Sequence, residues 1–237
     1  NVFGYIDTDS EVYSDIDGTP FGLDNNGFYK ETSAGEPLGR RDKLRQFTEE
    51  LQLLGTTFGE RLKYVVGAFY AKEKVYNLTT SDLFDFPGLR LIQTSEYQKR
   101  NTTYAGYAQG TYDLGEMVAD GLSFTAGVRY TDETIKLHLL PRDFHFDAPQ
   151  PGYEYDLKRK FNSWSWTLGL QYQMTPDTLV YVANRRSYRH GGLNGLVNPY
   201  PTYTDEGGAV YRTESVTDAE LGIKHQGRGP IPYHINL

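Results

Sequence analysis

The densest group of side chains that could recognise a ligand is the run from Arg185 to His190, RRSYRH. Guanidinium groups bind carboxylates and phosphates through paired hydrogen bonds, and aromatic rings offer flat surfaces for stacking. A long segment rich in Gly, Pro, Asn and Tyr follows His190, so the run lies beside a loop that a solute would reach. We therefore predict that Arg186, Tyr188, Arg189 and His190 bind a ligand, with ordinary charge at a strand end as the alternative.

A metal site is the second candidate. His138 and His145, with Asp143 and Asp147 between and beside them, have the right residue types for a metal site in a loop. The five histidines of the chain nevertheless lack the spacing that is typical of metal ligands. We interpret these four residues as solvated loop residues and predict no metal site.

Paired carboxylates are the third candidate. Glu49 and Glu50 are neighbours in an expected strand, so they point to opposite faces and cannot act together on a sugar. Asp218 and Glu220 share a face, but a polar lining explains them more simply. The chain has no cysteine, no Gly-x-Ser-x-Gly motif, no phosphate loop and no dinucleotide fingerprint. We predict that the protein is not an enzyme and has no catalytic residues and no cofactor.

The composition excludes further classes of protein. A chain of 237 residues is long enough for one large domain or two small ones. Its net charge is −7 and it has no basic block, so nucleic acid is not an expected partner. Mean hydropathy is −0.60 and no segment approaches the roughly 18 apolar residues of a spanning helix, which excludes a helical membrane protein. The aromatic share of 14%, with 20 Tyr, is unusual and requires an explanation.

Apolar and polar residues alternate with a period of two along much of the chain, which indicates β-strands. The clearest segments are Leu122–Tyr130 and Ser163–Met174. We predict about eight strands and a ninth that begins near Ile231. The eight expected ranges are 1–13, 43–55, 62–77, 99–114, 121–138, 160–174, 178–189 and 211–225.

Short and long connections alternate between these strands. The short ones are 55–61, 115–120, 175–177 and 227–230, and the long ones are 14–42, 78–98, 139–159 and 190–210. Every second connection being long places all long loops at one end of the sheet. This asymmetry, together with girdles of aromatic residues, is typical of bacterial outer-membrane barrels. Tyr and Trp rings are most stable where hydrocarbon meets water, which explains the aromatic excess.

The alternation also assigns the two faces of the expected sheet. Residues on the lipid-facing side are Leu122, Phe124, Val128, Trp164, Trp166, Leu168 and Leu170. Residues on the lumenal side are Thr125, Arg129, Thr167, Gln171 and Glu220. Because lipid-facing positions cannot reach a solute, we expect ligand contacts at the end with the long loops.

Two adjacent segments resemble a hairpin in the barrel of TonB-dependent outer-membrane receptors: Tyr104–Leu114 (YAGYAQGTYDL) and Leu122–Glu133 (LSFTAGVRYTDE). Three more segments agree with that family, namely 46–55, 179–194 and 214–224, although Ser187 stands where the family usually has glycine. The resemblance covers nearly the whole chain. Nothing in it resembles the plug, the peptide that engages the energy-transducing partner, or the aromatic C-terminal strand of such receptors.

The resemblance implies an all-β fold, an antiparallel up-and-down transmembrane β-barrel segment of about eight to nine strands that forms an open, curved half-barrel. We expect residues 1–237 to be one partial barrel domain, a fragment without a plug. The implied function is active uptake of a scarce solute, such as a ferric siderophore or similar chelate, across the bacterial outer membrane. The implied partners are membrane lipid, the small-molecule or metal-chelate ligand, and the TonB complex acting through the missing plug.

An alternative is a self-contained small outer-membrane barrel that serves as an adhesin or a structural protein. That protein would close by pairing its first strand with its eighth. The end of the sequence, where a strand begins near Ile231 and stops at Leu237, favours the fragment.

Overall fold

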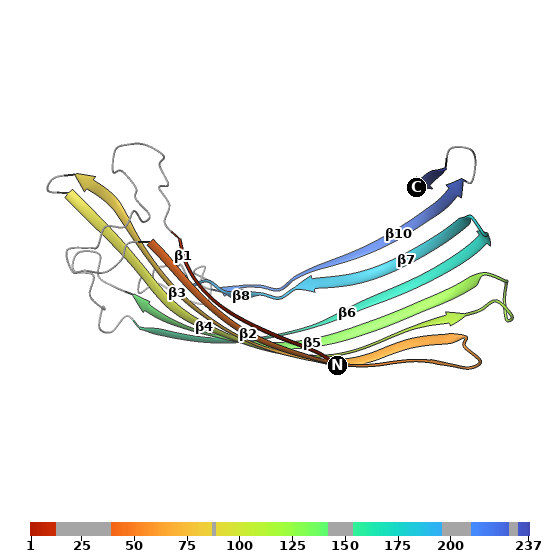
Figure 1. Cartoon of the computed structure of the whole chain (residues 1–237), viewed down its shortest axis with the longest axis horizontal. Helices are drawn as coiled ribbons and strands as arrows, with labels where there is room; N and C mark the ends of the chain where they lie inside the picture. Colours follow the sequence, from red (N-terminus) through yellow and green to blue (C-terminus); the bar gives the residue numbers. More distant parts are fainter. Residues whose placement is uncertain (13–38, 87–88, 142–153, 196–209, 228–231) are drawn as a thin grey trace.

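The computed structural model describes residues 1–12, 39–86, 89–141, 154–195, 210–227 and 232–237. Nearly all of them lie in β-strands, and the strands are long and bent, so that the sheet is curved (Figure 1). Within these ranges there is no helix long and apolar enough to cross a membrane. The strands are β1 (Val2–Val12), β2 (Gly39–Thr57), β3 (Leu62–Phe86), β4 (Leu89–Asp113), β5 (Leu122–Pro141), β6 (Tyr155–Thr175), β7 (Thr178–Arg189), β8 (Gly192–Leu193), β9 (Val210–Tyr211), β10 (Glu214–Gly227) and β11 (Tyr233–Asn236).

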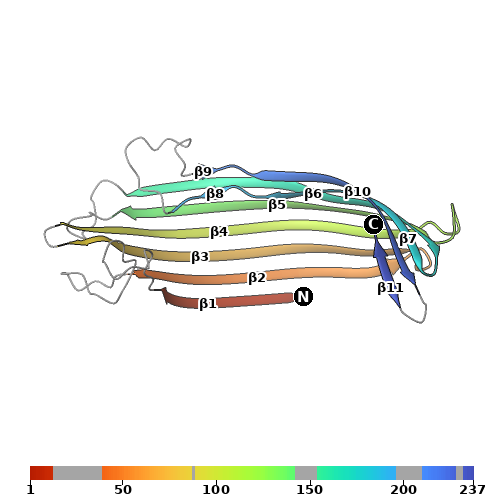
Figure 2. The ribbon, with the colours of Figure 1, turned by 90° about the horizontal axis from the view of Figure 1, so that it is seen from above.

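Nine of the strands form one antiparallel sheet in the order β1-β2-β3-β4-β5-β6-β7-β10-β11, and β8 pairs with β9 beside it. Each strand of the large sheet therefore pairs with its neighbour in sequence, as Figure 2 shows for β1 to β6. β1 pairs with β2 alone among the described strands, and no ladder joins it to β10. The predicted open, up-and-down sheet is confirmed, and the pairing that a closed small barrel requires is not found in these ranges.

One predicted long connection is wrong. We expected a loop over 78–98, whereas β3 continues to Phe86 and β4 begins at Leu89, with Phe86 and Leu89 as Cα partners. The segment contains three threonines, two serines, two aspartates, a proline and a glycine, a composition that is typical of turns. Pairing between two equally long strands outweighs that local preference, since the ladder satisfies the backbone groups of both.

The two faces of the sheet differ in the predicted way. Cross-strand partners share a face, and the pairs Phe124–Leu170, Val128–Trp166 and Tyr130–Trp164 place large apolar residues together on one side, which we call the apolar face. The residues Thr125, Arg129, Thr167, Gln171 and Glu220 lie on the opposite side, which we call the polar face. The predicted assignment of residues to the two faces is confirmed.

Aromatic rings cross the apolar face in two belts. The first belt consists of Phe3, Phe47, Tyr70, Tyr104, Tyr130 and Trp164, and contacting rings within it have centroids 4.7 to 6.0 Å apart. The second belt consists of Tyr112, Phe124 and Tyr172, near the short turns. Tyr104 and Tyr112 are eight residues apart, as are Trp164 and Tyr172, which corresponds to roughly 27 Å along a strand. Strands tilted by about 40° reduce this to a height of roughly 21 Å, somewhat less than the apolar band of a membrane barrel, about 25 Å.

A small apolar cluster covers the polar face at the end with the long connections. Ile135, Leu137 and Leu139 of β5 are buried there against Leu193 of β8, and Tyr97, Leu157, Phe161 and Val210 pack around them. The segment that leaves β7 folds back onto this face, so alternate residues of β5 are apolar here instead of polar. This cluster holds the end of β7 in place.

Candidate functional site

The chain leaves β7 through a histidine that is held firmly on the polar face. The side chain of His190 is 8% exposed, and its Nδ1 lies 2.8 Å from Oε2 of Glu133 on β5. The imidazole stacks on Tyr188 at 4.6 Å and on Phe161 at 6.2 Å between ring centroids. Its Nε2 is buried and has no hydrogen-bond partner among the described residues. His190 is therefore fixed in place, and its Nε2 is a buried nitrogen without a partner in the described part of the chain.

The four residues predicted from the run at the end of β7 do not form one cluster. Tyr188 and His190 are brought together by stacking. The guanidinium of Arg186 instead lies 5.1 Å from the ring centroid of Trp166, its cross-strand partner on the apolar face. Arg189 is exposed and stands opposite Glu214 of β10. Of the four residues, the structure thus brings only Tyr188 and His190 into contact.

A first polar network, which the sequence did not single out, crosses β2 to β5. The hydroxyl of Tyr107 donates a hydrogen bond of 2.5 Å to Oε1 of Glu50. The guanidinium of Arg129 lies 5.4 Å from the ring centroids of both Phe69 and Tyr107. Its Nε donates to the Thr131 hydroxyl at 3.3 Å, and no carboxylate among the described residues pairs with it. Arg129 is therefore a positive charge that remains available to an anion.

A second network joins β7 and β10 on the same face. Nε and one terminal nitrogen of Arg185 donate to Oδ2 of Asp218 at 3.1 and 2.9 Å, and Arg185 also pairs with Glu220. The hydroxyl of Tyr181 donates to Glu220 at 2.5 Å, and the ammonium of Lys224 lies 5.3 Å from the Tyr181 ring centroid. Asp218 and Glu220 are thus the polar lining that the sequence indicated, fixed by an arginine from the neighbouring strand.

Both networks border a single polar hollow of about 440 Å³, which we call the polar hollow. Tyr107 and Arg129 line it from one side, and Arg185 and Asp218 line it from the other, with Ser165 and Thr167 of β6 between them. Alternation with a period of two could place each of these residues on the polar face. Whether these residues lie close together depends on the pairing register of the strands, which cannot be read from the sequence.

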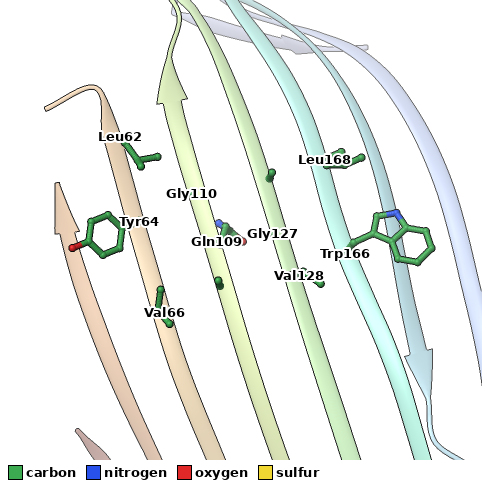
Figure 3. Close-up of a pocket in the computed structure, with 11 residues that line it drawn as sticks. Leu62, Tyr64, Val66, Gln109, Gly110, Gly127, Val128, Trp166 and Leu168 are labelled. Atoms are coloured by element: carbon green, nitrogen blue, oxygen red, sulfur yellow. The ribbon is translucent and has the colours of Figure 1, made fainter. Parts of the chain in front are cut away.

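A larger hollow of about 680 Å³ lies on the apolar face, between the two aromatic belts (Figure 3). Leu62, Tyr64, Val66, Val128, Trp166 and Leu168 surround it, and Ala108, Gly110 and Ala126 add only small side chains. Its lining is almost entirely apolar. A solute that passes along the polar face cannot reach it, whereas hydrocarbon chains can fill it.

A metal centre finds no support in the described part of the chain, which contains no group of three or more His, Asp or Glu side chains placed for one ion. His138 lies 3.0 Å from Oδ1 of Asp156, in a simple pair. Asp143, His145 and Asp147 lie outside the described residues.

Nine antiparallel strands, an apolar face bounded by aromatic belts and a polar opposite face define a segment of a transmembrane β-barrel. The profile of the family described as "TonB dependent receptor-like, beta-barrel" matches residues 3–231. The chain belongs to this family. No curated protein sequence matches it significantly.

Three solved structures share the fold. They are the ferric yersiniabactin uptake receptor FyuA from Yersinia pestis (TM-score 0.64, 16% identity), the siderophore receptor PiuA from Acinetobacter baumannii (0.59, 16%) and the ferric-catecholate import receptor Fiu from Escherichia coli K12 (0.56, 15%). The matches cover 79%, 78% and 79% of this chain. The chain spans only 27%, 30% and 29% of the length of those proteins.

Proposed function

We propose that this chain forms part of the wall of an outer-membrane receptor that takes up a scarce solute, with a ferric siderophore or similar chelate as the substrate class. The observation that carries the proposal is the polar hollow, where Arg129 carries a positive charge without a carboxylate partner on the face away from lipid. Membership of the receptor family and the siderophore receptors among the structural neighbours support the same role. The chain acts by binding and conducting its substrate, without catalysis.

The proposal includes the location and the partners of the intact receptor. The aromatic belts and the apolar band between them suit an outer membrane. The TonB complex would supply energy through a plug that would occupy the lumen on the polar face. Lipid would contact the apolar face, and the chelate would enter from the end with the long connections.

Uptake by cells tests this function. Deleting the gene that encodes the receptor should abolish transport of radiolabelled iron when it is offered as one class of chelate, such as catecholate or hydroxamate, under iron limitation. Restoring the gene should restore transport. Deletion that leaves the uptake of every iron chelate unchanged would remove the siderophore assignment, and parallel assays with haem, vitamin B12 and oligosaccharides would identify another solute.

Affinity measurements test which residues contact the ligand. We propose that Tyr188, Arg189 and His190 at the end of β7 contact the ligand together with Arg129, whereas Arg186, which lies over Trp166 on the apolar face, does not. Arg129→Gln and Arg189→Gln should each weaken binding of an anionic chelate about tenfold or more, because a hydrogen bond to a charged group contributes about 1.5–3 kcal/mol. Quenching of intrinsic fluorescence in the purified receptor gives the dissociation constants.

The matched control is Lys63→Gln, an exposed cation on the polar face beside the short turns. It should bind the chelate with unchanged affinity. Unchanged affinity in Arg189→Gln would leave Arg189 as ordinary charge at the end of a strand, and the same result for Arg129→Gln would remove the polar hollow from the ligand path.

A further inference from the structure

The chain that leaves β7 and the chain that enters β10 fold back together onto the polar face. They are residues 190–195 and 210–213, which we call the strap. Within the strap β8 pairs with β9, and β8 contacts both β5 and β6. The strap therefore lies against the wall of the sheet at the end with the long connections.

The middle of the strap is held by close packing. A Cβ at Gly191 would overlap the backbone at Tyr211, and a Cβ at Gly195 would overlap the ring of Tyr97 on β4. Leu193 is 4% exposed, in the apolar cluster that contains Leu137 of β5. Burial of apolar side chains thus attaches this part of the strap to the wall.

The first residue of the strap is held in a different way. Nδ1 of His190 lies 2.8 Å from Oε2 of Glu133, and the two side chains are 8% and 17% exposed. Because an ionised carboxylate only accepts hydrogen bonds, Nδ1 is the donor and the contact fixes one orientation of the imidazole ring. Tyr188 stacks on that ring at 4.6 Å between centroids, so its position depends on the same contact.

Burial of the strap does not require a carboxylate at position 133. Ile135, Leu137 and Leu139 follow on the same face of β5, and an apolar residue at position 133 would extend their cluster. Apolar burial has no preferred direction, whereas a hydrogen bond fixes the direction of the group that it holds. Since burying a carboxylate is unfavourable unless a partner compensates it, Glu133 suits the orientation of a neighbour better than it suits packing.

We propose that Glu133 is a positioning residue for the end of β7. By holding the imidazole of His190, it fixes the start of the strap and the ring of Tyr188. Its effect on affinity rests on the proposed function, in which Tyr188 and His190 meet the chelate. Glu133 acts through His190 and makes no contact of its own with the chelate.

Two variants with side chains of similar length separate orientation from packing. Glu133→Gln keeps an oxygen that accepts the hydrogen bond from Nδ1, whereas Glu133→Met fills the same space without an acceptor. Amide hydrogen exchange in the intact purified receptor should be about tenfold faster at residues 190–195 in Glu133→Met and close to the parent in Glu133→Gln, because a hydrogen bond to a charged group is lost only in the first.

Affinity is measured on the same proteins with ferric tricatecholate and ferric trihydroxamate as probes. The probe that the parent receptor binds should bind about tenfold more weakly to Glu133→Met and with near-parent affinity to Glu133→Gln. Quenching of intrinsic fluorescence gives the dissociation constants. Recovery in the Gln variant would show that the acceptor oxygen, and not the volume of the side chain, is what the site needs.

The matched control is Glu73→Met. Glu73 of β3 is a carboxylate on the polar face that accepts a hydrogen bond of 3.0 Å from Asn101 of β4, two strands away from β5. Loss of this hydrogen bond should leave both the exchange of the strap and the affinity for the probe unchanged. Heat-modifiable mobility in electrophoresis establishes that each variant is folded.

Equal exchange of the strap in the Met and Gln variants at position 133 would overturn the positioning role, and so would faster exchange with unchanged affinity. A Glu133→Met receptor that does not fold would overturn it as well, since the contact would then serve folding. A parent receptor that binds neither probe would contradict the proposed function, while the exchange measurement would still decide whether Glu133 fixes the strap.

Discussion

Gly67→Val is expected to remove most of the folded receptor from the membrane. Gly67 of β3 lies under the ring of Tyr107, its cross-strand partner on β4, and a Cβ at this position would overlap the ring. The ring would have to move away, which would break the hydrogen bond to Glu50 and the contact with Arg129. Overpacking costs about 1–3 kcal/mol. A lost hydrogen bond to a charged group adds about 1.5–3 kcal/mol.

Gly106→Val is the matched control. Gly106 lies on the next strand, and a Cβ there would meet no atom within 4 Å. Immunoblots of outer-membrane fractions and heat-modifiable mobility should show near-normal receptor for Gly106→Val and a severe loss for Gly67→Val. Equal amounts of both folded variants would mean that the Tyr107 ring adapts without cost, and the aromatic cover over Gly67 would then have no structural role.

The strands were predictable where the alternation is strict. From Leu122 to Tyr130 and from Ser163 to Met174, each residue lies on the face that its position in the alternation predicts. The physical reason is that one face meets an apolar medium and the other a polar one, so a slip of one residue would reverse every side chain. The same pattern correctly placed Asp218 and Glu220 on the polar face.

Prediction failed where tertiary contacts override local composition. The turn-like residues after Asn77 continue as a strand because β4 pairs with them. On β5 the residues Ile135 and Leu137 break the expected polar lining because the segment after β7 covers them. Such burial depends on a connection that packs from far along the chain, and no short window of sequence contains that information.

Sites that depend on the pairing register of the strands also could not be predicted from the sequence. Tyr107 and Asp218 are separated by 111 positions, and nothing in the sequence marks them as residues that line one hollow. The run at the end of β7 shows the opposite error. Its residues are adjacent in the sequence and were predicted to form one cluster, but the structure does not bring them all together. The strand directs Arg186 towards Trp166 and leaves His190 beside Glu133 on the polar face.

Leu168→Arg is expected to lower the free energy of unfolding of the receptor in a bilayer by about 2–4 kcal/mol, the cost of a lipid-facing arginine at the midplane of a membrane barrel. Leu168 lies midway between Trp164 and Tyr172 of the two belts and remains 44% exposed on the apolar face. Gln171→Arg places the same charge on the polar face, three residues along the same strand, and should change that free energy by less than about 1 kcal/mol because the charge remains hydrated. Urea titrations in lipid vesicles, followed by tryptophan fluorescence, give both values. Similar losses for the two variants would mean that both faces meet the same medium, and the assignment of the apolar face to lipid would then be wrong.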